Sequence, residues 1–148
     1  MPSGFQSIIS QLTDFFGGPK LVTGAQLALF ANTAISAKAG IVALAGGTLT
    51  ANTPVLNQTF NSVDTVATNN DSVALPPAIP GRFISIANMG AATLAIFAQT
   101  SNFSNSGAAD QIVLQTSTAL IASTTQATGV KADYFCAKIG VWQRTSIS

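Results

Sequence analysis

Carboxylates are the side chains in this sequence that are best suited to catalysis, because it contains neither histidine nor glutamate. Hydrolysis of a glycosidic bond needs a pair of carboxyl groups that flank the scissile bond. The five carboxylates are isolated from one another along the chain, at Asp14, Asp64, Asp71, Asp110 and Asp133. Turn and surface roles are therefore favoured, and we expect the protein not to be an enzyme.

Other reactive centres also lack the residues that they need. A cluster of histidines and cysteines around a metal is excluded, since Cys136 is the one cysteine. Cys136 lies in a Tyr-Phe-Cys-Ala segment typical of a buried strand, and no histidine is available to activate it as a nucleophile. The turn at 69–71 lacks the acidic spacing of a calcium loop, and Gly46-Gly47 does not precede the Lys-Ser or Lys-Thr of a phosphate loop. We expect no metal and no cofactor.

Three residues are candidates for an oligomer interface. Phe103 is an apolar residue within a polar loop at 101–110, which is typical of an interface anchor. Arg82 could pair with Asp71 or with a neighbouring subunit. Trp142 and Tyr134 could stack on a sugar, but core or intersubunit packing is favoured because aromatic residues on a closing hairpin usually fill the space between sheets.

The composition indicates a surface that associates readily. Charged residues make up 7% of the chain, compared with about 25% in an average domain, and the formal net charge is +1. The six lysines and arginines are scattered, so they cannot form the dense basic stripe that nucleic acid requires. Because an uncharged surface is poorly protected against association, we expect much of it to be covered by copies of the chain or by a partner.

Near the amino terminus the spacing of apolar residues predicts an amphipathic helix that ends at Gly17-Gly18-Pro19. Its apolar positions are Phe5, Ile8, Ile9, Leu12, Phe15 and Phe16. A helix of about 18 Å is too short to cross a bilayer, and no basic residue precedes it as in a secretory signal. Its polar face carries Asp14 but no cation, which disfavours binding to a membrane surface. We expect its apolar face to dock on another protein subunit.

Residues 21–50 are rich in alanine, glycine and threonine, and two interpretations of them stay open. They form an extended arm over a neighbouring surface, or they add strands to the domain that follows. We take residues 1–50 as an amino-terminal helix and arm, and residues 51–148 as a β domain.

Short strands separated by frequent turns predict an antiparallel β-sandwich or jelly roll over residues 51–148. Residues 53–60 are expected to form a strand, and residues 82–88 and 93–97 a hairpin. Pro76 and Pro77 cannot donate to a ladder, so the chain must leave the sheet there. Residues 123–129 are predicted as a turn. A final hairpin is expected to pair residues 130–138 with residues 141–145 through a turn at Gly140.

An ordered series of short motifs extends over residues 39–145. It consists of AGIVALAGG at 39–47, TVAT at 65–68 with Asp71-Ser72-Val73 and Leu75-Pro76, Pro80-Gly81, Asn88 with Gly90-Ala91, Phe97, and Phe135-Cys136 followed by Gly140 and Trp142. The series resembles a β module of virion proteins of tailed bacteriophages, similar to the small trimer-forming β-sandwich domains of head decoration, cement or head-fibre proteins. The first 38 residues are not covered by this pattern.

The resemblance implies a structural virion protein, a homotrimeric decoration or cement protein on the capsid exterior that stabilises the head. Its partners would be the major capsid protein and its own copies, with neither nucleic acid nor membrane involved. The six apolar helix residues would contact the capsid, and three attachments in one trimer would reinforce one another. The alternative is a tail or fibre component that binds a host surface glycan through exposed aromatic residues, for which Trp142 and Tyr134 are the candidates.

Overall fold

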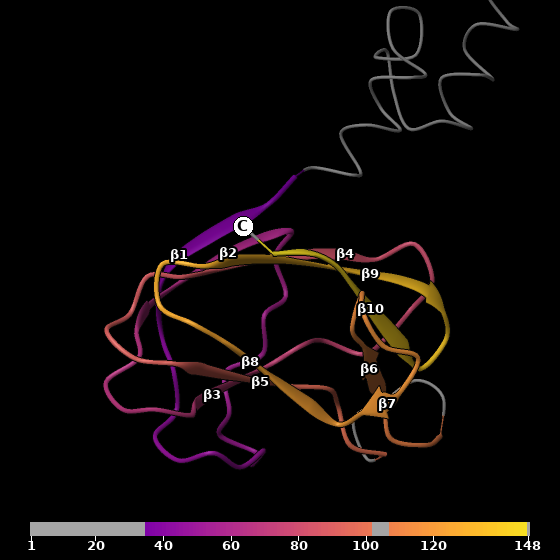
Figure 1. Ribbon diagram of the computed structural model, residues 1–148, viewed down its shortest axis with the longest axis horizontal. Coiled ribbons are helices and arrows are strands. Elements are labelled where there is room, and N and C mark those ends of the chain that lie inside the picture. The colour runs from indigo at the N-terminus through magenta and orange to yellow at the C-terminus, as the bar shows by residue number, and fades with distance from the viewer. Residues whose placement is uncertain (1–34, 102–106, 148) are drawn as a thin grey trace, which may run out of the picture. The chain divides into compact units, whose positions relative to one another are not determined.

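The computed structural model describes residues 35–101 and 107–147, and these residues form strands, turns and loops (Figure 1). The prediction of a mainly β protein is confirmed for this part of the chain. The predicted amino-terminal helix lies outside the described residues. The compact β unit begins at Ser36 rather than at residue 51. Its first strand, β1, pairs with β2, so the described part of residues 21–50 adds a strand to the β unit, which is the second of the two interpretations left open for this region.

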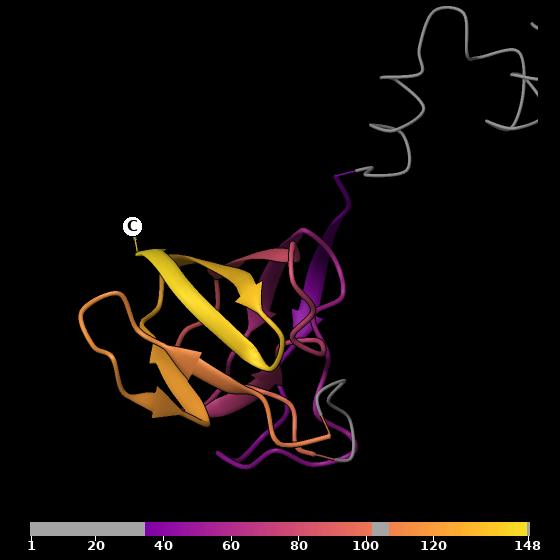
Figure 2. The same cartoon turned by 90° about the vertical axis from the view of Figure 1, so that its right-hand side faces the viewer.

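Within the described residues the strands form two sheets. The larger sheet contains, in spatial order, β1 (Ala37–Val42), β2 (Phe60–Thr65), β4 (Phe83–Asn88), β9 (Lys131–Lys138), β10 (Val141–Ile147), β6 (Gln111–Val113) and β7 (Leu120–Ile121). The smaller sheet contains β3 (Asp71–Ala74), β5 (Leu94–Phe97) and β8 (Ser123–Gln126). Figures 1 and 2 show the two sheets facing each other, with β9 and β10 in yellow within the larger one.

Both sheets are mixed, so the expectation of an all-antiparallel arrangement is wrong. The pairs β1–β2, β2–β4, β3–β5 and β6–β10 are parallel. From β2 to β5 consecutive strands alternate between the two sheets. A chain that crosses to the opposite sheet and back enters its first sheet again in the original direction, and parallel neighbours result. For the same reason the predicted hairpin of 82–88 with 93–97 does not form, since β4 and β5 belong to different sheets.

The predicted turn chemistry is confirmed at several points. Asn70 adopts a left-handed conformation with φ of 71° in the turn before β3, as short polar side chains tolerate. β3 ends at Ala74, before Pro76 and Pro77. Gly140 has φ of 77° between β9 and β10, which pair as the expected closing hairpin.

Two local predictions were wrong. The predicted strand at 53–60 is irregular and contributes an isolated bridge from Val55 to Ala74. The predicted turn at 123–129 instead contains β8, which pairs with β5. Its residues, Ser-Thr-Thr-Gln, are polar, and they join a sheet because β5 offers an unpaired edge.

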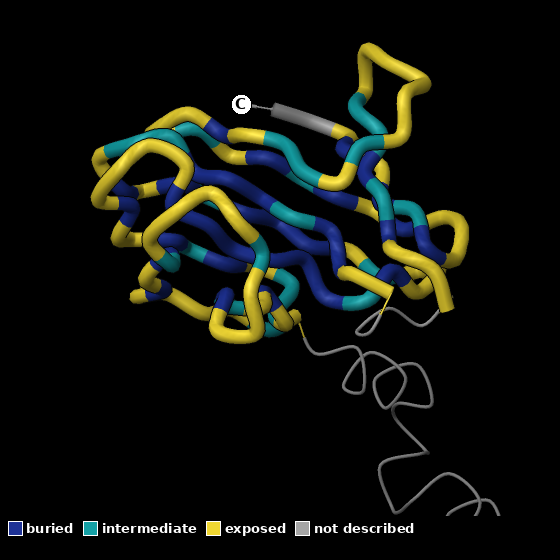
Figure 3. Tube along the Cα trace, turned by 90° about the horizontal axis from the view of Figure 1, so that it is seen from below, coloured by how far each residue is buried: buried dark blue, intermediate teal, exposed yellow. Residues whose placement is uncertain are grey.

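The core lies between the two sheets, where Figure 3 shows buried segments on the facing strands. Its large side chains are Ile41, Leu56, Val63, Val66, Val73, Leu75, Ile84, Ile86, Leu94, Ile96, Ile112, Tyr134 and Trp142. Buried Gln126 on β8 links the sheets, since its Nε2 donates to the carbonyl of Ile86 on β4 at 3.0 Å. A second link runs in the opposite direction, since the Nδ2 of Asn88 on β4 donates to the backbone carbonyl of Gln126 at 3.0 Å. The amide N–H groups of these two residues are thus paired across the core, whereas the buried Oε1 of Gln126 has no hydrogen-bond partner.

Candidate functional site

Trp142 and Tyr134 lie on the neighbouring strands β10 and β9, but both side chains are fully buried. The indole Nε1 of Trp142 donates to the carbonyl of Pro76 at 3.1 Å. The guanidinium of Arg144 lies 5.9 Å from the centre of the Tyr134 ring, and burial raises the pKa of the Tyr134 hydroxyl. Neither ring is accessible to a sugar or to another subunit. The expectation that the Trp142 side chain contacts another copy is therefore corrected, because that ring fills the core.

Arg82 is partly exposed, and its guanidinium binds backbone within its own chain. Its Nη1 donates to the carbonyl of Pro77 at 2.9 Å rather than to Asp71. This contact stabilises the loop between β3 and β4, and it leaves part of the guanidinium at the surface. Phe103 lies outside the described residues, as do Phe5, Ile8, Ile9, Leu12, Phe15 and Phe16.

Asp71 and Asp64 bind backbone N–H groups. Asp71 accepts hydrogen bonds from the backbone N–H groups of Ala67 and Thr68, both at 2.9 Å, and from the Thr68 hydroxyl at 2.6 Å. These bonds, the hydroxyl first, hold the pKa of Asp71 below its usual value. Asp64 accepts from the Ser62 hydroxyl and from the Gly40 N–H, and its pKa is lowered in the same way. Both carboxylates stabilise turns or bulges, as charged acceptors commonly do.

Asp110 is the most buried carboxylate among the described residues, with 1% of its surface exposed. One oxygen accepts the backbone N–H of Ala78 at 2.8 Å, and the other has no hydrogen-bond partner. Loss of hydration raises the pKa of Asp110 above its ordinary value. Burial also raises the pKa of the Cys136 thiol, so this residue behaves as the small buried side chain that the sequence predicted. Within the described ranges, histidine, cysteine and acidic side chains do not gather in groups of three that could hold a metal.

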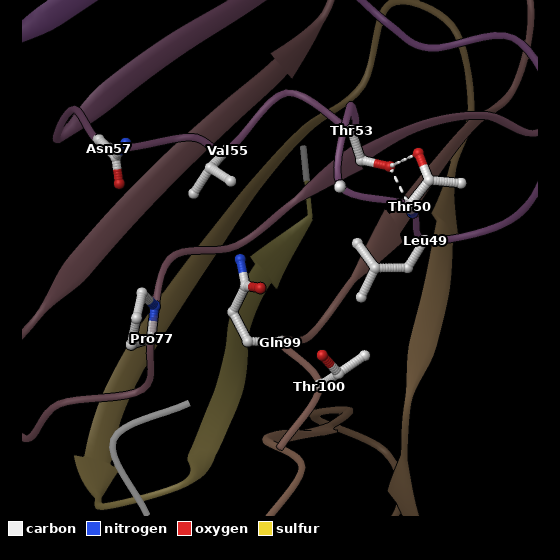
Figure 4. A pocket seen from close by; sticks show the side chains of 9 residues that line it. Leu49, Thr50, Thr53, Val55, Asn57, Pro77, Gln99 and Thr100 are labelled. Carbon is white, nitrogen blue, oxygen red and sulfur yellow. Dashed lines mark hydrogen bonds between the residues drawn. The ribbon is translucent and has the colours of Figure 1, made fainter. Parts of the chain in front are cut away.

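A pocket of about 310 Å³ lies beside the loop that connects β1 to β2. Figure 4 shows its labelled side chains, with the Thr53 hydroxyl bonded to the Thr50 N–H at 2.9 Å. Gln99 lines the pocket while its Nε2 donates to the carbonyl of Leu75 at 2.6 Å. The lining consists of Leu49, Thr50, Ala51, Thr53, Val55, Asn57, Pro77, Gln99 and Thr100. None of these side chains carries a charge, so the pocket suits a neutral ligand held by hydroxyl and amide groups.

Three phenylalanines stand on the outer side of the larger sheet, and we call them the phenylalanine patch. Phe60 on β2, Phe83 on β4 and Phe135 on β9 are 40%, 37% and 36% exposed. In β4 and β9 they alternate with buried residues such as Ile84 and Tyr134, so they point away from the core. None of these three phenylalanines was among the residues predicted to bind a partner. The alternation of exposed and buried positions in β4 and β9 is the sequence signal that identifies Phe83 and Phe135 as outward-facing.

Comparisons with protein-family models, with curated proteins and with solved structures found no match. Among residues 35–101 and 107–147 there is no helix long and apolar enough to cross a membrane. The described part of the chain thus offers two features that could bind a partner, a neutral pocket and an apolar sheet face.

Proposed function

We propose that this chain is a structural protein of a bacteriophage virion, a homotrimeric decoration or cement protein that binds the capsid exterior and stabilises the head. The two-sheet unit would be the β-sandwich domain of such a protein. Its role is mechanical rather than catalytic, and its partners are the major capsid protein and its own copies.

The observation that carries this proposal is the apolar character of the surface of the β unit. Large apolar side chains that are more than one-third exposed are Ile35, Val42, Val55, Phe60, Ile79, Phe83, Met89, Leu120, Phe135 and Ile139. Three of them, Phe60, Phe83 and Phe135, share the outer side of the larger sheet, and an apolar face in a chain with 7% charged residues is typical of a surface that another protein covers. The ordered motifs at residues 39–145 add support through their resemblance to phage virion modules.

In this function the β units associate with one another, and the amino-terminal segment attaches them to the capsid. The apolar face of the predicted helix, from Phe5 to Phe16, supplies the attachment. One bound arm holds the other two near their sites, so three weak contacts give tight overall attachment. The added contacts between capsid subunits resist expansion of the shell.

Antibody-gold labelling of intact virions tests this proposal. Label spread over the head is expected, and virions that lack the protein should lose their genome at a lower temperature than complete virions. Label confined to the tail would overturn the decoration function.

The neutral pocket favours a second candidate function, a tail or fibre component that binds a host surface glycan. Thr50, Asn57 and Gln99 offer the hydroxyl and amide groups that hydrogen-bond to uncharged sugars. Asn57→Ala should then reduce binding to host cells, whereas the matched change Asn52→Ala, at an exposed residue outside the pocket lining, should not. If both variants bind host cells equally well, or if both lose binding, the glycan-binding function is wrong.

A further inference from the structure

We propose that the phenylalanine patch is the surface through which copies of this chain associate, around an axis that runs parallel to the strands in front of β4. This inference rests on the self-association in the proposed function, but it requires neither a capsid nor a virion. It also replaces buried Trp142 with exposed residues at the subunit contact.

Strand register brings the three rings together. Phe83 lies directly opposite Phe135 in the pairing of β4 with β9. Phe60 lies opposite Ser85, two residues from Phe83 on the same side of β4. Ser85 shares this outward side and is only 3% exposed, and its cross-strand neighbours are Phe60 on β2 and Asp133 on β9. The rings therefore form one continuous apolar surface over three adjacent strands.

The area of the patch indicates the centre of an interface rather than a whole one. A buried aromatic side chain covers roughly 200 Å², so three rings at 36–40% exposure leave roughly 200 Å² uncovered. A stable interface needs about 800 Å² from each partner. The remainder must come from the surrounding outward positions, such as Ser62, Ala87, Ala137 and Gln143. These side chains are small or uncharged, so a second sheet can approach to the usual distance of about 10 Å.

The placement of charge favours a copy of this chain as the occupant. Lys131 lies on β9 opposite Ala87, and Ala87 lies opposite Ser62 on β2. Asp64 is two residues beyond Ser62 on the same side of β2. The face therefore carries the Lys131–Asp133 ion pair on its β9 side and an anion, Asp64, on its β2 side, at the same end of the strands. Both groups are accessible, since Asp64 is exposed and the Lys131 side chain is 48% exposed while it contacts Asp133 at 3.5 Å.

An axis parallel to the strands makes this face complementary to itself. Rotation about an axis in front of β4 brings the β2 side of one copy against the β9 side of the next. Asp64 of one copy then faces Lys131 of another, and the rings meet near the axis. The relation holds for two copies and equally for three, so it is consistent with a trimer. Opposite charges at the rim fix the register of an apolar contact more than they strengthen it.

Sedimentation velocity on the purified full chain tests the patch, in the absence of virions. We expect the natural chain to associate, and the double variant Phe83→Thr with Phe135→Thr to raise the dissociation constant at least about tenfold, as loss of central aromatic anchors does. The control is Val55→Thr with Leu120→Thr, which replaces side chains 41% and 53% exposed that lie beside β3 and on β7, away from β2, β4 and β9. A natural chain that is monomeric at every concentration, or a control that weakens association equally, would overturn the proposal. Cooperative thermal unfolding of each variant confirms that it is folded.

Charge exchange tests the axis separately. Lys131→Asp should weaken association because it places like charges together, and the combination with Asp64→Lys should restore it. Lys138→Asp makes the same change of charge at an exposed residue on the opposite side of β9 and should have no effect. Failure of the second substitution to restore association would overturn the arrangement. Neither result depends on where the protein lies in a virion, so failure of the capsid proposal remains distinguishable.

Discussion

Two aspartates on the described chain respond to pH in opposite directions. The pKa of Asp71 is lowered by its bonds to Thr68 and Ala67, so its contribution to stability is present above its unfolded value of about 3.8 and is lost as the pH falls below that value. The pKa of Asp110 is raised by burial, so ionisation of Asp110 opposes folding. Its penalty is absent well below pH 3.8, grows as the pH rises from this unfolded value to the higher folded pKa, and is complete above the folded pKa.

Asp110→Asn should therefore unfold at a higher temperature than the natural chain at neutral pH. The amide oxygen keeps the acceptor for the Ala78 N–H, while the buried charge is removed. Thermal unfolding followed from pH 3 to pH 7 should show the two proteins converging at the acidic end. If the difference in stability between Asp110→Asn and the natural chain is the same at pH 3 and at pH 7, ionisation of Asp110 does not affect the stability of the protein.

Gly90 lies where the backbone of one segment meets another, and a side chain does not fit. A Cβ at this position would stand 2.4 Å from the amide nitrogen of Val66 and 2.5 Å from its Cβ. Because backbone must move to relieve such contacts, Gly90→Ala should lower the free energy of unfolding by at least about 1–3 kcal/mol. Gly47→Ala, whose nearest contact is Asn70 Cβ at 3.3 Å, should cost less in the same urea titration. Equal losses of unfolding free energy in the two variants would mean that the backbone around Gly90 shifts easily to admit a methyl group.

At the scale of elements, the two sheets are joined by side chains of β8 as well as by apolar packing. Gln126→Leu removes the donor to the carbonyls of Ile86 and Val130 while it keeps most of the side-chain volume. We expect a loss of about 1–3 kcal/mol in unfolding free energy, because buried carbonyls lose a partner. Gln115→Leu at an exposed loop position should change stability little. A Gln126→Leu chain as stable as the natural one would show that water replaces the amide.

The sequence predicted what depends on local pattern. Alternation located most strands, and Asn70, Pro76 and Gly140 placed turns correctly. Pairing was not predictable in the same way, since Arg82–Asn88 and Thr93–Phe97 have the pattern of a hairpin but enter different sheets. The polar segment at 123–126 became a strand through an edge that β5 provides. Trp142 was assigned to an interface because burial depends on the opposite sheet, which no local spacing describes.

At the scale of the whole molecule, low charge predicts that association is insensitive to salt. With 7% charged residues, the proposed self-association would rest on apolar burial, which screening does not weaken. Raising sodium chloride from about 0.05 M to 1 M shortens the screening length to about 3 Å. The dissociation constant measured by sedimentation should then change by less than about threefold, a small effect of screening at the Asp64 and Lys131 rim. If the dissociation constant instead rises steeply with salt concentration, charge pairs rather than apolar burial would be the main source of the association.

The position of the closing hairpin in the larger sheet has a consequence for how the chain is made. β9 and β10 are last in sequence, yet they lie between β4 and β6 in the sheet. During synthesis β1, β2 and β4 leave the ribosome before the strands that join them to β6 and β7, so β4 and β6 each present an unpaired edge until β9 and β10 appear. Pairing of distant segments is slow, and open edges are sites of aggregation. A chain that terminates before β9 divides the larger sheet, so this sheet becomes continuous only once β9 and β10 have been made.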